Sequence, residues 1–151
     1  MMHIKDIKNH INNKSRLIGV DMGTKRVGLS ISDENRKIAT PLKTVNYENI
    51  QILADELKKI ANENNVHAII FGNPKNMDGT EGSSSQSVKD KVKLISEKIK
   101  IPIFLWDERL STVGAFNLSS ELDINVSKRV KNIDKNAAAF ILQGGLDFLD
   151  N

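Results

Sequence analysis

Acidic side chains stand at the boundaries of three apolar segments, and they are the residues of this sequence best suited to chemistry. Asp21 closes one apolar run, Asp107 and Glu108 follow another over residues 101–106, and Asp134 lies near the start of the last predicted helix. Judged singly, each has a structural explanation as a turn residue, a cap or a carboxylate on a helix dipole. Judged together, they predict carboxylates that converge at one edge of a sheet and repel one another unless a cation neutralises them.

The residue types indicate which cation this is. The chain has no cysteine, and its histidines are His3, His10 and His67. Oxygen donors without thiolates or paired histidines favour Mg²⁺ or Mn²⁺ over zinc. Two such ions about 3.5 to 4 Å apart are the usual device for in-line attack of water on a phosphodiester. The expected metal ligands are Asp21, Asp107, Glu108 and Asp134.

Basic residues lie close in sequence to these acidic ones. Lysine and arginine number 22 against 19 aspartates and glutamates, so the formal net charge of +3 permits a polyanionic partner without requiring one. A lysine-rich segment is about as often a solvated surface without a partner as it is a binding surface. Beside carboxylates that hold a metal, cations suit the backbone of a nucleic acid. The candidate phosphate-binding residues are Lys25, Arg26, Arg109, Lys128, Arg129, Lys131 and Lys135.

Alternating and periodic apolar residues predict the elements that must position these side chains. Strands are predicted over about 17–21, 27–33, 37–45, 66–71 and 101–106, with Pro41 marking an edge strand or a bulge. Helices are predicted over about 46–64, capped by Asn46, over 88–99, and from Ile133 onward after a polar and basic stretch. Three antiparallel strands followed by helix, strand, helix, strand and helix predict a mixed five-stranded α/β sheet with helices on both faces.

The length of 151 residues and a hydrophobic content of 39% describe one ordinary domain with its own core. Ile4, Ile7 and Ile11 predict a short amphipathic helix within residues 1–15, an extension ahead of a domain at 16–151. The N-terminal residues are too polar for a secretory signal, and no apolar run approaches the roughly 18 residues of a membrane span. We therefore expect a cytoplasmic protein with no membrane partner.

Four segments resemble, in family order, the four motifs of the YqgF (RuvX) family. They are residues 17–28, 73–82, 106–112 and 133–138, the last continuing through Ile141 to Gly144. Any one of these motifs is a weak signal, whereas four in order are highly specific. The departures from the family pattern that we note are Gly114 and Ser83, and they concern loop shape rather than the acidic positions.

The resemblance implies an RNase H-like fold related to the Holliday-junction resolvase RuvC. It further implies a bacterial nuclease that processes the 5′ end of pre-16S ribosomal RNA in ribosome biogenesis, with precursor rRNA as partner. The catalytic acidic residues of the family would fall on Asp21, on Glu108 with Asp107 beside it, and on Asp134.

Three other functions remain open at this stage. Metal chemistry and a basic surface serve a resolvase of branched DNA as well as an RNA-processing nuclease. The protein can be a monomer or a homodimer, and a homodimer with two sites spaced across a junction would favour DNA as the substrate. A domain of this fold can also bind nucleic acid or a transcription complex without cleaving. The segment 18–24 resembles the first phosphate loop of actin-like ATPases, but those proteins close two such domains over ATP, and 151 residues supply one.

Overall fold

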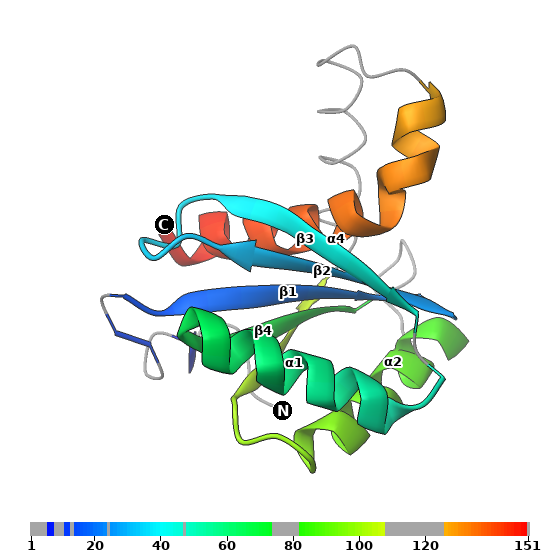
Figure 1. Cartoon of the computed structure of the whole chain (residues 1–151), viewed down its shortest axis with the longest axis horizontal. Helices are drawn as coiled ribbons and strands as arrows, with labels where there is room; N and C mark the ends of the chain where they lie inside the picture. The colour runs from blue at the N-terminus through cyan, green and yellow to red at the C-terminus, as the bar shows by residue number, and fades with distance from the viewer. Residues whose placement is uncertain are drawn as a thin grey trace.

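The fold is a single sheet with helices on both sides, seen in a computed structural model (Figure 1). The structure describes residues 6–7, 11–12, 14–23, 25–46, 48–73, 82–107 and 126–150, with only the backbone of 83–84, 126–136 and 150. Within these residues the order is β1 (Arg16–Met22), β2 (Arg26–Ser32), β3 (Ala39–Asn46), α1 (Ile50–Asn64), β4 (Val66–Asn73), α2 (Ser83–Ser96), β5 (Ile103–Asp107) and α4 (Val126–Asp150).

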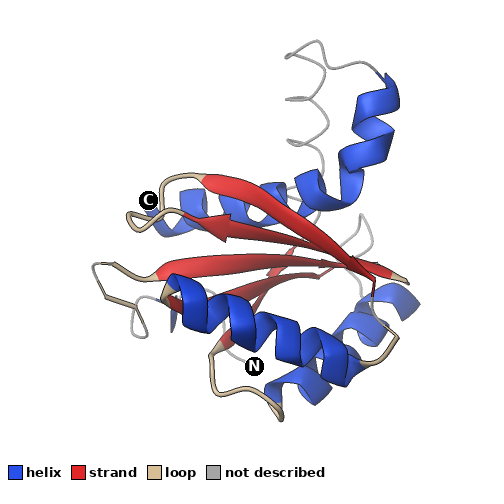
Figure 2. Ribbon diagram, in the orientation of Figure 1, coloured by secondary structure: helices blue, strands red, loops and turns tan. Residues whose placement is uncertain are grey.

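The strands lie in the order β3-β2-β1-β4-β5. The pairs β1–β2 and β2–β3 are antiparallel, whereas β1–β4 and β4–β5 are parallel. Helices α1 and α2 cover one face of the sheet, and α4 covers the other (Figure 2). The predicted mixed five-stranded sheet, with three antiparallel strands followed by two parallel ones, is confirmed.

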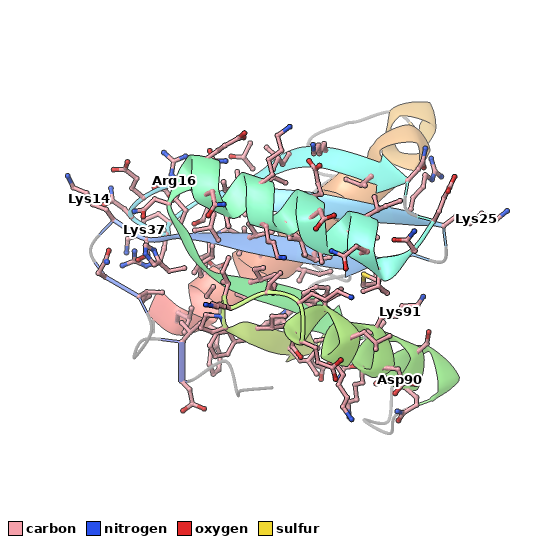
Figure 3. All side chains as sticks on the ribbon, turned by 60° about the horizontal axis from the view of Figure 1, so that its bottom comes forward. Lys14, Arg16, Lys25, Lys37, Asp90 and Lys91 are labelled. Atoms are coloured by element: carbon pink, nitrogen blue, oxygen red, sulfur yellow. The ribbon has the colours of Figure 1, made fainter. Side chains whose placement is uncertain are left out.

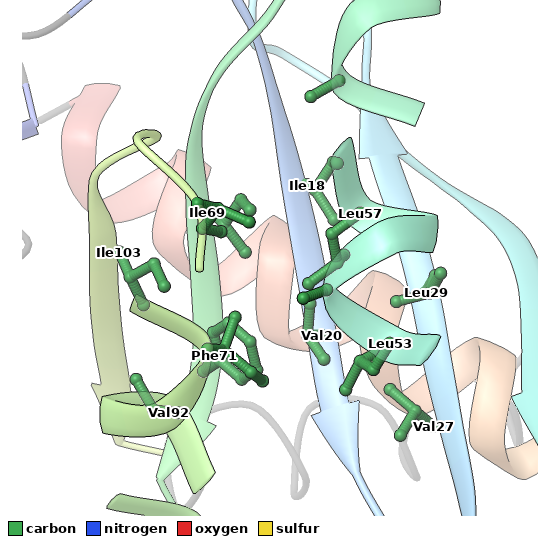
Figure 4. Packing of buried hydrophobic residues seen from close by; sticks show 14 of the residues in the cluster. Ile18, Val20, Val27, Leu29, Leu53, Leu57, Ile69, Phe71, Val92 and Ile103 are labelled. Carbon is green, nitrogen blue, oxygen red and sulfur yellow. The ribbon is translucent and has the colours of Figure 1, made fainter. Parts of the chain in front are cut away.

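Strand alternation divides the core into two clusters, one on each face of the sheet. On the side of α1 and α2, Ile18 and Val20 of β1 pack with Leu53 and Leu57 of α1 and Phe71 of β4 (Figure 4). These five side chains are fully buried. Residues two apart along a strand therefore lie on the same face of the sheet, and we call them residues of the same parity.

The second cluster lies between the sheet and α4. It contains Leu17 of β1, Ile70 of β4 and Phe104 of β5, packed with Ile141 and Leu142 of α4. Because these contacts are apolar and therefore non-directional, they hold α4 on the sheet but do not fix its rotation or its position along its axis.

Two local predictions about β3 and α1 have different outcomes. Pro41 lies on the edge strand β3, where the register against β2 shifts between Leu29 and Ser30, as its residue type predicts. The cap of α1 is Asn49, whose side-chain oxygen accepts the Ile52 N–H at 2.9 Å. The prediction of Asn46 as the cap is wrong, because Asn46 continues the β3 ladder.

The last helix is longer than the sequence predicts. Helix α4 begins at Val126, so the basic stretch ahead of Ile133 is helical. Asp134 consequently lies more than two turns inside the helix, where the positive end of a helix dipole no longer explains an acidic residue. No helix in the described part of the chain has the length and apolarity needed to cross a membrane.

The start of the chain is described only in part. Asp6 and Ile7 form a short 3-10 turn, and Ile7 is fully buried in the cluster under α4, with Ile11 packed against it. Ile11, Asn12, Lys14 and Ser15 are not helical. The rest of residues 1–15 lies outside the described residues, and their division from the domain at 16–151 stays a prediction.

Candidate active site

The carboxyl ends of the three parallel strands meet at one edge of the sheet. Val20 of β1 is level with Phe71 of β4, and Asn73 at the end of β4 is level with Asp107 at the end of β5. Asp21 follows Val20, so Asp21 and Asp107 stand at the same edge with β4 between their strands. Two strand spacings separate these strands by about 10 Å.

Asp21 and Asp107 belong to opposite faces of this edge. Asp21 has the parity of Leu17, which packs under α4. Asp107 has the parity of Ile103, which packs under α1 and α2, whereas Trp106 lies in the cluster under α4. Both carboxylates are half-buried. A ligand that contacts Asp21 lies on the α4 side of the sheet. In β5, the side chains on that side are those with the same parity as Trp106.

The end of β4 between these carboxylates is fixed by a buried hydrogen bond. The Ser85 hydroxyl, in the first turn of α2, donates to the Asn73 side-chain oxygen at 2.5 Å, and both residues are buried. Sequence reasoning missed this pair because it ended the strand before Asn73 and placed that residue in a loop. The available signal was the position of Asn73 directly after an apolar run.

Helix α4 approaches β1 unusually closely at Gly19. A Cβ placed on Gly19 would lie 2.5 Å from the Ser30 Oγ, 2.6 Å from the Leu142 Cβ and 2.9 Å from the Ala138 carbonyl oxygen. Ser30 is the cross-strand partner of Gly19, and its hydroxyl donates to the Ala138 carbonyl at 2.8 Å. A glycine inside an apolar strand is the sequence signal for such an approach, and sequence reasoning did not use it.

The direction of α4 along the sheet follows from two of its contacts. Ala138 lies over Gly19, while Gln143 bonds the backbone of Lys37 and Ala39, at the end of the sheet where β1 begins. Helix α4 therefore runs opposite to β1. One turn before Ala138, about 6 Å along the helix, the chain reaches Asp134, and a similar advance along β1 leads from Gly19 to Asp21.

Figure 1 shows the first turns of α4, in orange, bent away from the sheet, while the red part lies along it. The backbone remains helical through residue 134. Ala138, which lies over Gly19 of β1, comes four residues after position 134.

Two of the predicted basic residues lie at the same edge, Lys25 in the β1–β2 turn and Arg26 at the start of β2. The turn is closed by the Gly23 N–H, which donates to the Arg26 carbonyl at 2.9 Å, and a Cβ on Gly23 would approach that oxygen to 2.4 Å. Lys25 and Arg26 are exposed. Figure 3 shows Lys25 at the end of the sheet opposite to Lys14, Arg16 and Lys37.

The remaining predicted residues fall wholly or partly outside the described residues. Glu108 and Arg109 follow β5 and are not described. Five others lie on α4, where only their backbone is described: Lys128, Arg129, Lys131, Asp134 and Lys135. Among the side chains that the structure describes, no three of His, Asp or Glu form a group that could hold a metal ion.

The sequence of this chain matches the model of a known protein family. The family model described as RuvX, Holliday junction resolvase, matches residues 15–148. The chain belongs to the RuvX family. All the predicted acidic positions lie within the matched range.

Curated members of the RuvX family are similar to this chain over nearly their full length. A protein of Pelagibacter ubique, strain HTCC1062, is 62% identical over 151 residues, which is 100% of both chains. A protein of Cereibacter sphaeroides, strain KD131, is 42% identical over 99% of this chain and 95% of its own length. Both carry the name of a candidate pre-16S rRNA nuclease. The predicted enzyme class, a nuclease, is confirmed.

Solved structures show the fold of this RuvX-family chain. RuvC of Thermus thermophilus, in complex with a Holliday junction substrate, has a TM-score of 0.50 at 12% identity, over 84% of this chain and 91% of that chain. The yeast mitochondrial resolvase Ydc2 has a TM-score of 0.50 at 14% identity, over 97% and 84%. These likenesses confirm the predicted RNase H-like fold.

Proposed function

We propose that this RuvX-family nuclease hydrolyses phosphodiester bonds of precursor 16S rRNA in the cytoplasm and processes its 5′ end, using Mg²⁺ or Mn²⁺. The names of its full-length relatives support the RNA substrate. The observation that carries the site is that the ends of β1, β4 and β5 meet at one edge, with α4 packed against β1 one turn after position 134.

Asp21, Glu108 and Asp134 are the proposed catalytic carboxylates. Asp21 belongs to the α4 face of the sheet. Glu108 has the same parity along the chain as Phe104 and Trp106, which pack on that face. Parity therefore favours Glu108 over Asp107 as the direct metal ligand. Asp107 then supports the site from the other face.

The donor chemistry of this edge fits a hard divalent cation. The proposed ligands are carboxylate oxygens, and no cysteine exists to compete. When bound, the cation would offset the repulsion between the carboxylates and supply Lewis acidity toward a phosphate and an attacking water. The chain's own contribution is to hold these carboxylates at the edge.

We propose that the protein binds its substrate by electrostatic attraction to the phosphates. Lys25 and Arg26 are exposed beside the end of β1. Arg109 follows Glu108 in sequence, and the first half of α4 supplies the remaining cations: Lys128, Arg129, Lys131 and Lys135. Such residues bind phosphates and fix register without reading bases.

Metal exchange should separate binding from cleavage. We expect cleavage of a short RNA in Mg²⁺ or Mn²⁺ and none in EDTA. Ca²⁺ should support RNA binding but little cleavage, because its larger radius and looser geometry misplace the attacking water. Mn²⁺ should raise the melting temperature by mass action, and ATP should add nothing to that shift. A large shift specific to ATP would contradict the proposal and favour an ATPase.

The substrate is decided by a direct comparison. Purified protein in Mn²⁺ is incubated in parallel with the 5′ region of precursor 16S rRNA and with a four-way DNA junction. Preferential cleavage of the RNA supports the proposal. Preferential cleavage of the junction supports the alternative of a resolvase, which the family description and the fold likeness to RuvC favour. Binding of both without cleavage by metal-loaded protein would indicate a non-cleaving nucleic-acid-binding domain.

Removal of two basic residues of α4 should weaken the grip uniformly. For Arg129→Ala with Lys131→Ala, the log-log salt dependence of the binding constant should flatten by roughly 0.7 to 0.9 per lost phosphate contact. Affinity should fall equally for different RNA sequences. The matched control replaces Lys58 and Lys59 of α1, on the other face of the sheet, and should leave the slope unchanged. A changed preference among sequences would mean that Arg129 and Lys131 read bases.

A further inference from the structure

The hydroxyl of Ser30 lies at the joint between the sheet and α4. Ser30 is fully buried on the face of β2 that α4 covers. Its Oγ donates to the Ala138 carbonyl at 2.8 Å and also lies 3.3 Å from the Gly19 carbonyl oxygen. One hydroxyl thus contacts the strand that carries Asp21 and the helix that carries Asp134.

A directional bond matters at this place because the α4 side chains packed around it are apolar. Ala138, Ile141, Leu142 and Leu146 pack on the sheet. Apolar contacts are non-directional and tolerate small slides, whereas a hydrogen bond weakens steeply when its geometry changes. The Ser30–Ala138 bond therefore restricts rotation and sliding of α4 more sharply than the apolar contacts around it do.

A second polar contact of α4 lies at the opposite end of the sheet. Gln143 accepts the Ala39 N–H and donates to the Lys37 carbonyl, both at 2.9 Å. Ser30 bonds the helix one turn after Asp134, near the end of β1 where Asp21 lies. Of Ser30 and Gln143, Ser30 contacts α4 nearer in sequence to Asp134.

We propose that Ser30 is a positioning residue of the nuclease, which holds α4 so that residue 134 stands level with Asp21 for joint binding of the cation. The inference rests on the proposed function, because it needs Asp134 as a metal ligand. It predicts that loss of the hydroxyl affects the metal and the catalytic step more than the grip on nucleic acid.

The test compares Ser30→Ala with a matched control, Ser32→Ala. Ser32 lies on the same strand and face and is 2% exposed, but its hydroxyl accepts the Leu17 N–H and donates to the Asp33 carbonyl. Affinity for Mn²⁺ alone is measured through thermal shift and through the fluorescence of Trp106, the single tryptophan, which adjoins Asp107. Turnover and KM are measured on a short RNA.

We expect Ser30→Ala to lower Mn²⁺ affinity and kcat by about 10-fold or more, as loss of a partner behind a metal ligand does, with KM for RNA within about twofold. Ser32→Ala should change each of these by less than about twofold. Equal effects of the two variants on Mn²⁺ affinity and kcat would overturn the inference, because Ser30 would then contribute to stability alone.

A double substitution separates this inference from the proposed function. If Ser30 acts through Asp134, adding Ser30→Ala to Asp134→Asn should not lower Mn²⁺ affinity further. A further loss as large as in the wild-type background would overturn the role of Ser30 and leave the site intact. Wild-type turnover and Mn²⁺ affinity in Asp134→Asn alone would overturn the proposed site itself.

Discussion

Asp21→Asn, Glu108→Gln and Asp134→Asn should each lower turnover by more than about 100-fold and leave the fold intact. Loss of a partner behind a metal ligand already costs about 10- to 100-fold, and loss of the ligand itself should cost more. Without metal, stability should stay equal or rise, because each substitution removes one of several charges that repel one another. Turnover on RNA in Mn²⁺ measures the first effect, and the melting temperature in EDTA measures the second.

The matched control for these variants is Asp147→Asn. Asp147 lies on the same helix as Asp134 and accepts a hydrogen bond from the Gln143 side chain at 2.9 Å, far from the acidic edge. It should keep wild-type turnover. If all three site variants keep wild-type turnover, in preparations shown to be free of contaminating nuclease, the site lies elsewhere.

The same assay tests the assignment of Glu108 over its neighbour. Asp107 has the parity of Ile103 and Leu105, which pack on the face of α1 and α2. Asp107→Asn should therefore reduce turnover less than Glu108→Gln. A larger loss at Asp107 would reverse the two roles, and it would mean that β5 changes its alternation at its end.

Local patterns were sufficient to predict the sheet and the place of Asp21. Strand alternation and short turns depend on neighbouring residues, so the meander β1–β2–β3 and the buried run in β4 could be predicted from the sequence. The cap of α1 was displaced by three residues because Asn46 and Asn49 are both good caps, and pairing with Arg26 keeps Asn46 in the sheet. Tertiary pairing decided between two equal local signals.

The geometry behind the acidic edge could not be predicted from local patterns. The Ser30–Ala138 bond joins residues 108 positions apart, and nothing near either residue in sequence indicates the other. The basic composition around Lys128 concealed that the helix begins at Val126. Consequently Asp134 was placed at a helix start, where the dipole explains a carboxylate, although it lies well inside α4. Because α4 begins at Val126, Asp134 is not in the first turn, and the helix dipole does not explain an acidic residue there.

Gly19→Ala should destabilise the protein although it adds a single methyl group. The added Cβ would meet the Ser30 Oγ, the Leu142 Cβ and the Ala138 carbonyl at 2.5, 2.6 and 2.9 Å, and the last two cannot rotate away. Overpacking of this kind costs about 1 to 3 kcal/mol of unfolding free energy. For a chain of this size we expect the melting temperature to fall by roughly 2 to 12 °C.

The same substitution should reduce activity beyond its effect on stability. To accept the methyl group, α4 must move off β1 at the turn that follows Asp134, and a displacement of about 1 Å in a catalytic constellation can cost about 100-fold in rate. Turnover is therefore measured well below the melting temperature, where the variant is folded. Adding Ser30→Ala removes the nearest clashing atom, so the stability loss of the double variant should be smaller than the sum of the single losses. If Gly19→Ala melts and turns over like the wild type, α4 does not lie against β1 at Gly19, and the alignment of Asp134 with Asp21 has no structural basis.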